Sequence, residues 1–441
     1  MIKKVTPSKI SIVVIMLLIT MISSNLNWGK EYWKGILRVD GKGYYAYLPA
    51  VFIYHDLNFG FYDTIENKEY FNKNNVYDYR SNGNWKTINK YYCGTAVAEL
   101  PFFLTAHLLS YLLDYKTDGY SKLYPIFITI ATLFYLFLGL VFLNLILAGY
   151  HIKEWEKSLV LFAAVFGTNL FYYTVGEPSM SHVYSFAFIT MFLYYSQQYF
   201  SAFRKKYIPI LALIFGVIIL IRPINGLILF VLPFIAGDFI TFKKGVSNLF
   251  VNKVRLLFSL FIVIGVFAIQ FVIYKISTGS FIIYSYQDEG FNFLNPHIID
   301  ILFSYKKGLF LYTPLYLISL VGGYFLWKNS RYLFISWFGF FLLITYVFSS
   351  WWNWYYGGSF SSRVYVEFIS VFMILLGLAL HHIKFKTSKN LFVSLIILIT
   401  IVCQIQTVQY RFNHIHWSEM TKEKYWNVFF VKSALKHLDK Y

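Results

Sequence analysis

Charged residues are scarce in this sequence. Asp, Glu, Lys and Arg make up 14% of the 441 residues, whereas a soluble domain usually has about a quarter. The mean hydropathy is +0.53, which excludes a soluble enzyme, a disordered chain and a secreted disulfide scaffold. Several apolar runs instead reach the roughly 18 residues that cross a bilayer as a helix. The sequence therefore predicts an all-α polytopic membrane protein.

Cysteine is rare, and basic residues outnumber acidic ones. Cys93 and Cys403 are the two cysteines, so neither a disulfide framework nor a thiolate metal site is indicated. The 39 Lys and Arg against 21 Asp and Glu give a net charge of +18. In a soluble protein this excess would suggest nucleic-acid binding. Here the basic residues gather in short loops between apolar runs, as the positive-inside rule requires, so we expect contact with membrane lipids and no nucleic-acid partner.

Twelve apolar segments are candidates for membrane helices. Lys3, Lys4 and Lys9 accompany the start of the first segment, and no small-residue cleavage site follows it, so we expect an uncleaved signal anchor. The twelve segments are 10–26, 94–113, 123–149, 158–175, 182–202, 207–221, 224–242, 254–276, 309–327, 332–350, 364–381 and 391–408.

Segment 94–113 decides the predicted topology. It contains Glu99, Pro101 and His107, which are poor residues for a lipid-facing span. If it crossed the membrane, the basic cluster 204–206 would lie outside, which the positive-inside rule disfavours. We therefore predict about 11 transmembrane helices, with 94–113 on the outer face and the N-terminus in the cytoplasm.

This topology predicts one membrane-embedded catalytic domain over residues 1–408. It has a first outer loop at 27–122, with juxtamembrane helices, and a second at 277–308, followed by a short outer-face tail at 409–441. Because no stretch between the spans is long enough to fold alone, we expect the loops to form amphipathic helices on the membrane surface. The predicted location is the bacterial inner (plasma) membrane, with the active site facing the periplasm or exterior.

Two acidic residues flank predicted spans on the outer face. Asp40 stands in a Gly-rich turn after the first span, followed by Tyr44, and Glu177 lies between two later spans, followed by His182. Ionisable residues at membrane depth are functional candidates, and the two carboxylates can act on a reacting hydroxyl or share a divalent cation. From spacing alone, Asp40 fits a helix N-cap as well, Glu177 fits a favourable charge at a helix N-terminus, and His182 fits a packed interface histidine.

Basic residues on the same predicted face are candidates for phosphate binding. Arg222 ends a short span before a proline, and the planar guanidinium suits a phosphate group. Simple snorkelling of the side chain to the interface explains Arg222 equally well. Lys306, Lys307 and Arg363 offer the same chemistry from other loops, although adjacent lysines commonly contact solvent or lipid headgroups.

The turn 350–363 has the densest aromatic cluster. Trp351, Trp354 and Tyr355 precede two glycines and a Ser-rich turn. Aromatic belts are ordinary at membrane interfaces, but flexible glycines beside aromatic rings also fit a surface that stacks a sugar ring or a prenyl chain. We therefore include the three aromatic residues among the candidates for sugar or prenyl binding, together with Tyr44 and His182.

The absent motifs restrict the chemistry. There is no Gly-rich phosphate loop, dinucleotide fingerprint, paired metal-histidine helix or nucleophile elbow. An enzyme at the outer face also lacks a supply of ATP or nucleotide sugars. An activated group would therefore have to arrive on a lipid.

Several of these turns resemble motifs of the integral-membrane C-type glycosyltransferases (GT-C fold), a group that includes protein O-mannosyltransferases and lipid A aminoarabinose transferases. The resemblance extends over about 10–408, and Ala98–Pro101 replaces the Lys-Pro-Pro turn common in the family. The turns that carry it are Asp40-Gly-x-Gly-Tyr-Tyr, Glu177-Pro-Ser-Met, Arg222-Pro-x-Asn, Lys307-Gly-Leu-Phe-x-Tyr-x-Pro and Gly357-Gly-Ser-Phe-x-x-Arg363.

The resemblance implies a glycosyltransferase that moves a single hexose or pentose from a polyprenyl-phosphate-linked donor to an envelope glycan, lipid or protein. It implies Asp40 and Glu177 as catalytic residues, inversion at the sugar, and no cofactor beyond a divalent cation, if one is used. Two alternatives stay open from the residues: a lipid or solute transporter or flippase, and a lipid-linked glycan polymerase or ligase. A transporter usually has repeated halves and polar residues at mid-membrane, neither of which is visible here.

Overall fold

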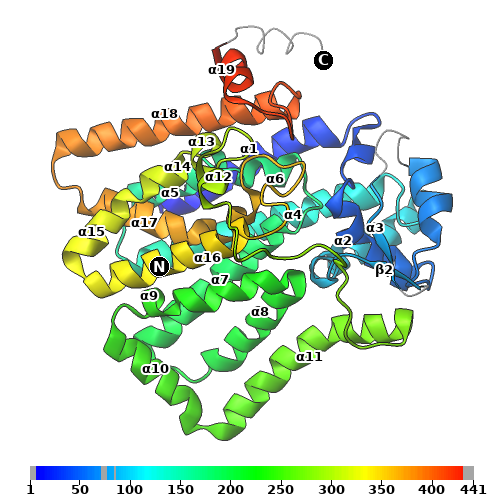
Figure 1. The fold of residues 1–441 in the computed structure, drawn as a ribbon, viewed down its shortest axis with the longest axis horizontal. Coiled ribbons are helices and arrows are strands. Elements are labelled where there is room, and N and C mark those ends of the chain that lie inside the picture. Colours follow the sequence, from blue (N-terminus) through cyan, green and yellow to red (C-terminus); the bar gives the residue numbers. More distant parts are fainter. Residues whose placement is uncertain (1–5, 71–76, 84–85, 431–441) are drawn as a thin grey trace. The chain divides into compact units, whose positions relative to one another are not determined.

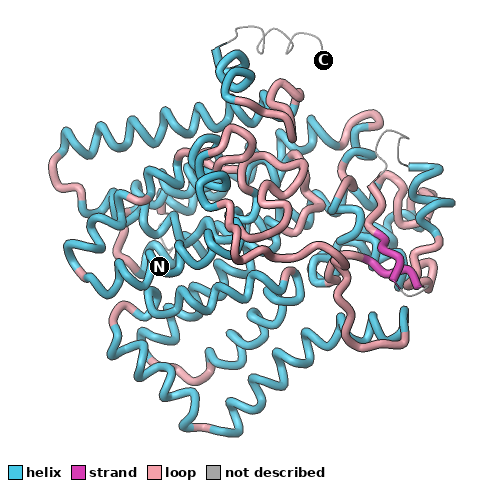
Figure 2. Tube along the Cα trace, in the orientation of Figure 1, coloured by secondary structure: helices cyan, strands magenta, loops and turns pink. Residues whose placement is uncertain are grey.

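The computed structural model describes residues 6–70, 77–83 and 86–430. Within these ranges the protein is mostly helical, with one two-stranded hairpin (Figures 1 and 2). The chain divides into two compact units. Unit 1 comprises Met1–Ser11, Asn144–Tyr172 and Gly290–Tyr441, and unit 2 comprises Ile12–Leu143 and Tyr173–Glu289.

Seven helices among the described residues are long and apolar enough to span a membrane, so the protein is a multi-pass membrane protein. Two others that were predicted as spans, α7 (His182–Ala202) and α8 (Tyr207–Ile221), also form with the predicted bounds. The seven are α1 (Pro7–Asn27), α3 (Gly94–Leu112), α4 (Leu123–Gly149), α11 (Lys253–Thr278), α16 (Arg331–Ser349), the stretch Arg363–His382 formed by η4 (Arg363–Phe368) and α17 (Ile369–His382), and α18 (Lys386–Arg411).

Three segments predicted as single spans are instead broken helices. Segment 158–175 forms α5 (Glu154–Phe166) and α6 (Leu170–Val175). Segment 224–242 forms the 3-10 helix η3 (Pro223–Val231), α9 (Leu232–Ala236) and the start of α10 (Phe239–Val251), and segment 309–327 forms α13 (Leu309–Tyr312), α14 (Leu315–Ser319) and α15 (Val321–Asn329).

These breaks coincide with residues that interrupt a helix and with side chains that satisfy the freed backbone groups. Thr168 Oγ1 accepts the Leu170 amide at 3.2 Å, and the Gln404 side chain donates to the Phe166 carbonyl at 2.6 Å. Pro314 has no amide hydrogen to continue the helix begun by α13. Broken helices are stable at membrane depth only where protein or water satisfies the backbone, and at the break between α5 and α6 the side chains of Thr168 and Gln404 do so.

The sequence predicts that segment 94–113 stays out of the membrane. The helix that this segment forms, α3, is instead long and apolar enough to span a membrane. Glu99 is fully buried and accepts a hydrogen bond from the Tyr184 hydroxyl at 2.9 Å. His107 bonds the Tyr124 hydroxyl at 2.7 Å. The polar residues that argued against a crossing therefore face protein, and the total of eleven crossings stays a prediction.

The stretch 27–122, predicted as the first outer loop, contains more regular structure than expected. It forms η1 (Tyr32–Gly35), α2 (Asp40–Phe52), the π-helix η2 (Tyr62–Tyr70) and an antiparallel hairpin of β1 (Arg80–Gly83) and β2 (Lys86–Asn89). Arg80 pairs with Asn89 and Gly83 with Lys86. The hairpin corrects the all-α prediction locally.

Within unit 2, α8 packs on α7, α11 and α3, and α2 packs on α3. Within unit 1, α17 is the central helix: 94% of its spanning stretch is buried, and it contacts α5, α14 and α15. Gly322 of α15 lets α15 and α17 come close together, because a Cβ at this position would lie 2.1 Å from the carbonyl oxygen of Leu375 in α17. The remaining elements of unit 1 are α12 (Ile298–Phe303) and α19 (Lys422–Phe430), the latter in the predicted tail 409–441, whose last residues, 431–441, lie outside the described residues.

Candidate functional site

Asp40 is the first residue of α2 and is buried. The preceding residue, Val39, has φ 47° and ψ −130°. A positive φ is a genuine outlier for a β-branched residue, and such strain persists only where surrounding contacts hold it, frequently at functional sites. Asp40 therefore follows a sharp, strained turn of the backbone at the start of α2.

The turn that contains Glu177 packs directly against this position. Arg38 Nη2 donates to the Gly176 carbonyl at 3.0 Å and lies 3.3 Å from Glu177 Oε1. Ser179 Oγ donates to the Ile36 carbonyl at 2.8 Å. A Cβ at Gly41 would lie 2.0 Å from Ser179 Oγ, so only glycine permits this approach, and the two acidic turns of the sequence are neighbours in unit 2.

Aromatic residues connect Asp40 to Arg222. The ring of Tyr44 lies 4.7 Å from that of Tyr91, and the ring of Tyr91 lies 6.4 Å from that of Tyr286. Burial raises the pKa of Tyr91, and the charge of Asp40 adds to this effect. Burial also raises the pKa of Tyr286, which Asp40 raises further and Arg222 lowers. Asp40 and Arg222 therefore both influence the half-buried Tyr286 electrostatically.

Close helix packing determines where Arg222 lies. A Cβ at Gly94, the first residue of α3, would lie 2.2 Å from the Ile221 backbone nitrogen. This contact holds the end of α8 against the start of α3. The Asn225 side chain donates to Ser185 Oγ at 3.0 Å, which attaches the Arg-Pro turn to α7.

A buried ion pair joins α2 to η2. Lys42 Nζ lies 3.0 Å from Glu66 Oε1, and both side chains are completely inaccessible to solvent. Glu66 Oε2 accepts hydrogen bonds from the hydroxyls of Tyr79 at 2.9 Å and Tyr120 at 3.0 Å. Burial raises the pKa of Glu66, against the attraction of Lys42. Lys42 is two residues from Asp40, so this pair connects the candidate acid to η2.

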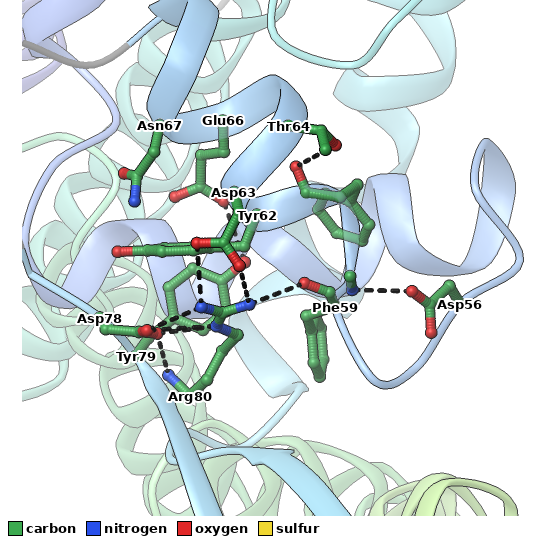
Figure 3. Close-up of polar contacts among 12 residues, drawn as sticks. Asp56, Phe59, Tyr62, Asp63, Thr64, Glu66, Asn67, Asp78, Tyr79 and Arg80 are labelled. Atoms are coloured by element: carbon green, nitrogen blue, oxygen red, sulfur yellow. Dashed lines mark hydrogen bonds and ion pairs between the residues drawn. The ribbon is translucent and has the colours of Figure 1, made fainter.

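Arg80 holds η2 against the hairpin (Figure 3). Its guanidinium lies 3.0 Å from Asp63 Oδ2 and 2.9 Å from Asp78 Oδ2, and its central carbon lies 4.0 Å above the Tyr62 ring. Glu66 projects from the same π-helix (Figure 3). Sequence analysis missed both Lys42 and Glu66, because burial of a charged residue has no signature in a single sequence.

His182 is buried at the start of α7, with its ring 4.6 Å from that of Tyr173 in an edge-on contact. This is the packed histidine that sequence analysis kept as an alternative. Its contact with Tyr173 supports a structural role more directly than a role in ligand binding.

The other candidate residues belong to unit 1. Lys307 is buried, and its Nζ donates to the Ser359 carbonyl and lies 5.0 Å from the Tyr410 ring. Lys306 Nζ lies 3.3 Å from the centre of the Tyr355 ring. The predicted Lys-Lys-Gly and Gly-Gly-Ser motifs are therefore neighbours in unit 1.

The tryptophans of the turn 350–363 pack on the segment before α12. Trp351 pairs with Phe291 through a β-bridge and an edge-on ring contact at 4.8 Å. The Trp354 ring stacks on His297 at 5.6 Å. Arg363 begins η4 directly after this turn. The aromatic cluster thus holds the turn 350–363 against the segment before α12 in unit 1.

Asp40, Glu177, Arg222, Tyr44 and His182 thus all belong to unit 2. The candidates in unit 1 form a second set, and the prediction that both sets line one pocket stays a prediction. The unit 1 set is Lys306, Lys307, Trp351, Trp354, Tyr355 and Arg363.

No group of three or more His, Cys, Asp and Glu side chains that could hold a metal occurs in the part of the chain that the structure describes. Glu177 has Arg38 as a partner. The possibility that Asp40 and Glu177 share a divalent cation stays a prediction.

The sequence matches no protein-family model and no curated protein. Its structure is similar to that of the archaeal oligosaccharyltransferase AglB from Archaeoglobus fulgidus, described in complex with an inhibitory peptide and a dolichol-phosphate, with a TM-score of 0.50 and 10% sequence identity. The match covers 97% of this chain and 59% of AglB, so the chain spans less than two thirds of that protein's length. The fold of this chain is therefore similar to that of AglB, and the GT-C relationship that the sequence motifs implied stays a prediction.

Proposed function

We propose that this protein is a membrane glycosyltransferase. It transfers one sugar from a polyprenyl-phosphate-linked donor to a hydroxyl of an envelope glycan, lipid or protein at the outer face. The similarity to a protein described with dolichol-phosphate supports a lipid-linked donor. The observation that carries the proposal is the packing of the Asp40 turn against the Glu177 turn through Arg38 and Ser179, in the same unit as Arg222.

The proposed reaction is a direct displacement. The acceptor oxygen forms a bond to the anomeric carbon, and the bond between that carbon and the phosphate oxygen breaks. Asp40 receives the acceptor proton, which requires hydrogen-bond reach of the hydroxyl. The polyprenyl phosphate leaves with one more negative charge than the donor carried, and Arg222 stabilises that charge. A single displacement inverts the anomeric centre.

Positioning follows from the contacts of unit 2. Arg38 neutralises Glu177 and holds its turn against α2, while the Lys42–Glu66 pair holds α2 from the other end of the outer loop. Tyr91 and Tyr286 stay protonated because desolvation raises the pKa of each. Their hydroxyls are therefore neutral hydrogen-bonding groups beside the charged ones.

The experiment is Asp40→Asn in purified protein supplied with a membrane extract of lipid-linked sugars. We expect a loss of about 10²- to 10⁴-fold in turnover, measured as release of polyprenyl phosphate by mass spectrometry. This readout separates sugar transfer from flipping, which leaves the donor intact. Asp114→Asn, an exposed residue of the same loop, is the matched control and retains full turnover. Normal turnover by a folded Asp40→Asn variant would remove Asp40 from the mechanism.

A further inference from the structure

Unit 1 contains a cavity of about 510 Å³ whose walls are strongly basic. It lies where α5 begins, α17 ends and α18 begins, so three helix ends border it. None of its residues belongs to the candidate site described above. The lining residues are Lys153, Trp155, His381, Ile383, Lys384, Lys386, Lys389 and Asn390.

The positive charge of this cavity exceeds what its own acid can balance. The buried Glu156 pairs with Lys389 and lies 3.9 Å from His381 Nδ1. The other three lysines, Lys153, Lys384 and Lys386, are exposed, and no ion pair joins them to any residue within the described ranges.

The basic residues also stand at the unfavourable end of a helix. Lys386 and Lys389 occupy the first turn of α18, which has no acidic residue. The helix dipole makes an N-terminus attract anions and repel cations. Clustering lysines there costs stability in the empty protein, and a bound anion removes that cost because the backbone amides and the lysines then act on the same charge.

The surroundings favour a lipid over a soluble anion. Phe385, between two of the lysines, is 80% exposed, and Trp155 is 44% exposed. Only 33% of the spanning window of α18 is buried, so this helix faces lipid along most of its length. Exposed aromatic rings next to lysines are typical of the headgroup region of a membrane. The positive-inside rule predicts the cytoplasmic side for the loops 150–157 and 382–390.

We infer that this cavity binds the phosphate of an anionic membrane lipid. Lys153, Lys384 and Lys386 contact the headgroup, while Phe385 and the apolar surface of α18 contact the acyl chains. Basic cavities between transmembrane helices bind anionic headgroups in this way. The inference is independent of the proposed function, since the cavity shares no residue with Asp40 or Arg222.

The test is lipid binding to the full-length protein in detergent, measured by native mass spectrometry. Dioleoylphosphatidylglycerol is expected to bind as one retained molecule, and dioleoylphosphatidylcholine, which has no net charge, at least tenfold more weakly. The triple variant Lys153→Gln, Lys384→Gln, Lys386→Gln should bind phosphatidylglycerol about 100-fold more weakly, because each lysine near an anionic group contributes roughly fivefold.

A matched variant controls for the general loss of charge. Lys205→Gln, Lys243→Gln, Lys253→Gln removes three exposed lysines from outside the cavity and should bind like the parent protein. The three single variants of the cavity, each expected to lose about fivefold, keep the test valid if the triple variant folds poorly.

Three results would overturn the inference. Equal binding by the cavity variants and the parent would show that the lysines are not the site. Equal affinity for phosphatidylcholine and phosphatidylglycerol would show that binding does not depend on the charge of the headgroup. Displacement of phosphatidylglycerol by submillimolar inorganic phosphate would identify free phosphate, and not a lipid, as the occupant.

Discussion

At the scale of single residues, the most consequential feature is the completely buried pair of Lys42 and Glu66. Removing one partner of a buried pair leaves an uncompensated charge, which costs about 3–5 kcal/mol. The two tyrosine hydroxyls on Glu66 stabilise its carboxylate but do not replace the lysine. The pair therefore matters for stability mainly when one member is changed alone.

We predict that Lys42→Met lowers the free energy of unfolding by about 3–5 kcal/mol, measured as chemical or thermal unfolding in detergent. The double variant Lys42→Met, Glu66→Gln should recover more than half of this loss, because no buried charge is left unpaired. Additive effects of the two substitutions would contradict a direct interaction.

At the scale of secondary-structure elements, the contact between α3 and α8 holds Arg222. The Gly94 Cα approaches the backbone of Leu220 and Ile221 so closely that any side chain collides with backbone atoms. Backbone atoms cannot move aside as a flexible side chain can. A substitution there must therefore separate the two helices.

Gly94→Ala is expected to destabilise the protein by about 1–3 kcal/mol through overpacking and to reduce turnover by displacing Arg222. The comparison is Gly265→Ala in α11, where a Cβ would meet nothing within 4 Å and alanine favours the helix. Unfolding midpoints and turnover of both variants give the result. Parent-like behaviour of Gly94→Ala would refute the close contact.

The start of α5 carries an acid that makes stability depend on pH. Although burial opposes it, hydrogen bonds from Lys157 and Ser8 lower the pKa of Glu154 to about 2. Ser8 Oγ donates to Glu154 Oε2 at 2.6 Å, which attaches the start of α1 to α5 within unit 1. A carboxyl in an unfolded chain has a pKa of about 4.3. The folded protein therefore favours the ionised form.

Because the folded pKa is the lower one, the stabilisation is complete above pH ~4.3 and is lost as the pH falls towards 2. We predict that the parent protein has a higher unfolding midpoint than Glu154→Gln at pH 6. The difference should shrink steadily between about pH 4.5 and pH 3. A constant difference across this range would mean that Glu154 is not the titrating group.

At the scale of the whole molecule, the orientation of α3 decides the topology. The positive-inside rule predicts that residues before and after α3 lie on the same, outer side. Yet α3 has the length of a span, and its Glu99 faces protein. The charge distribution thus predicts that α3 does not cross the membrane, whereas its length predicts that it does. Cysteine labelling can decide between the two.

We predict that Asn58→Cys and Asp114→Cys react with a membrane-impermeant maleimide in intact cells, whereas Lys205→Cys reacts only after permeabilisation. The native Cys93 and Cys403 are buried and give little background. Labelling of Asn58→Cys and Lys205→Cys from outside, without labelling of Asp114→Cys, would mean that α3 crosses the membrane and that the predicted topology is wrong.

The sequence by itself determined the membrane class, because 20-residue apolar runs have no other stable environment. It also identified the turns at Asp40, Glu177 and Arg222, since polar residues next to such runs are conspicuous. Helices with continuous apolar composition, such as α4 and α8, form with the bounds that hydropathy predicted.

The tertiary structure alone decided which apolar runs are broken and which polar residues are buried. Hydropathy cannot distinguish a straight span from α5 and α6, whose freed backbone groups are satisfied by residues far away in the chain. It also cannot reveal that Lys42 meets Glu66 or that Gly94 admits no side chain. These features depend on contacts between distant segments, and such contacts exist only after the chain has folded.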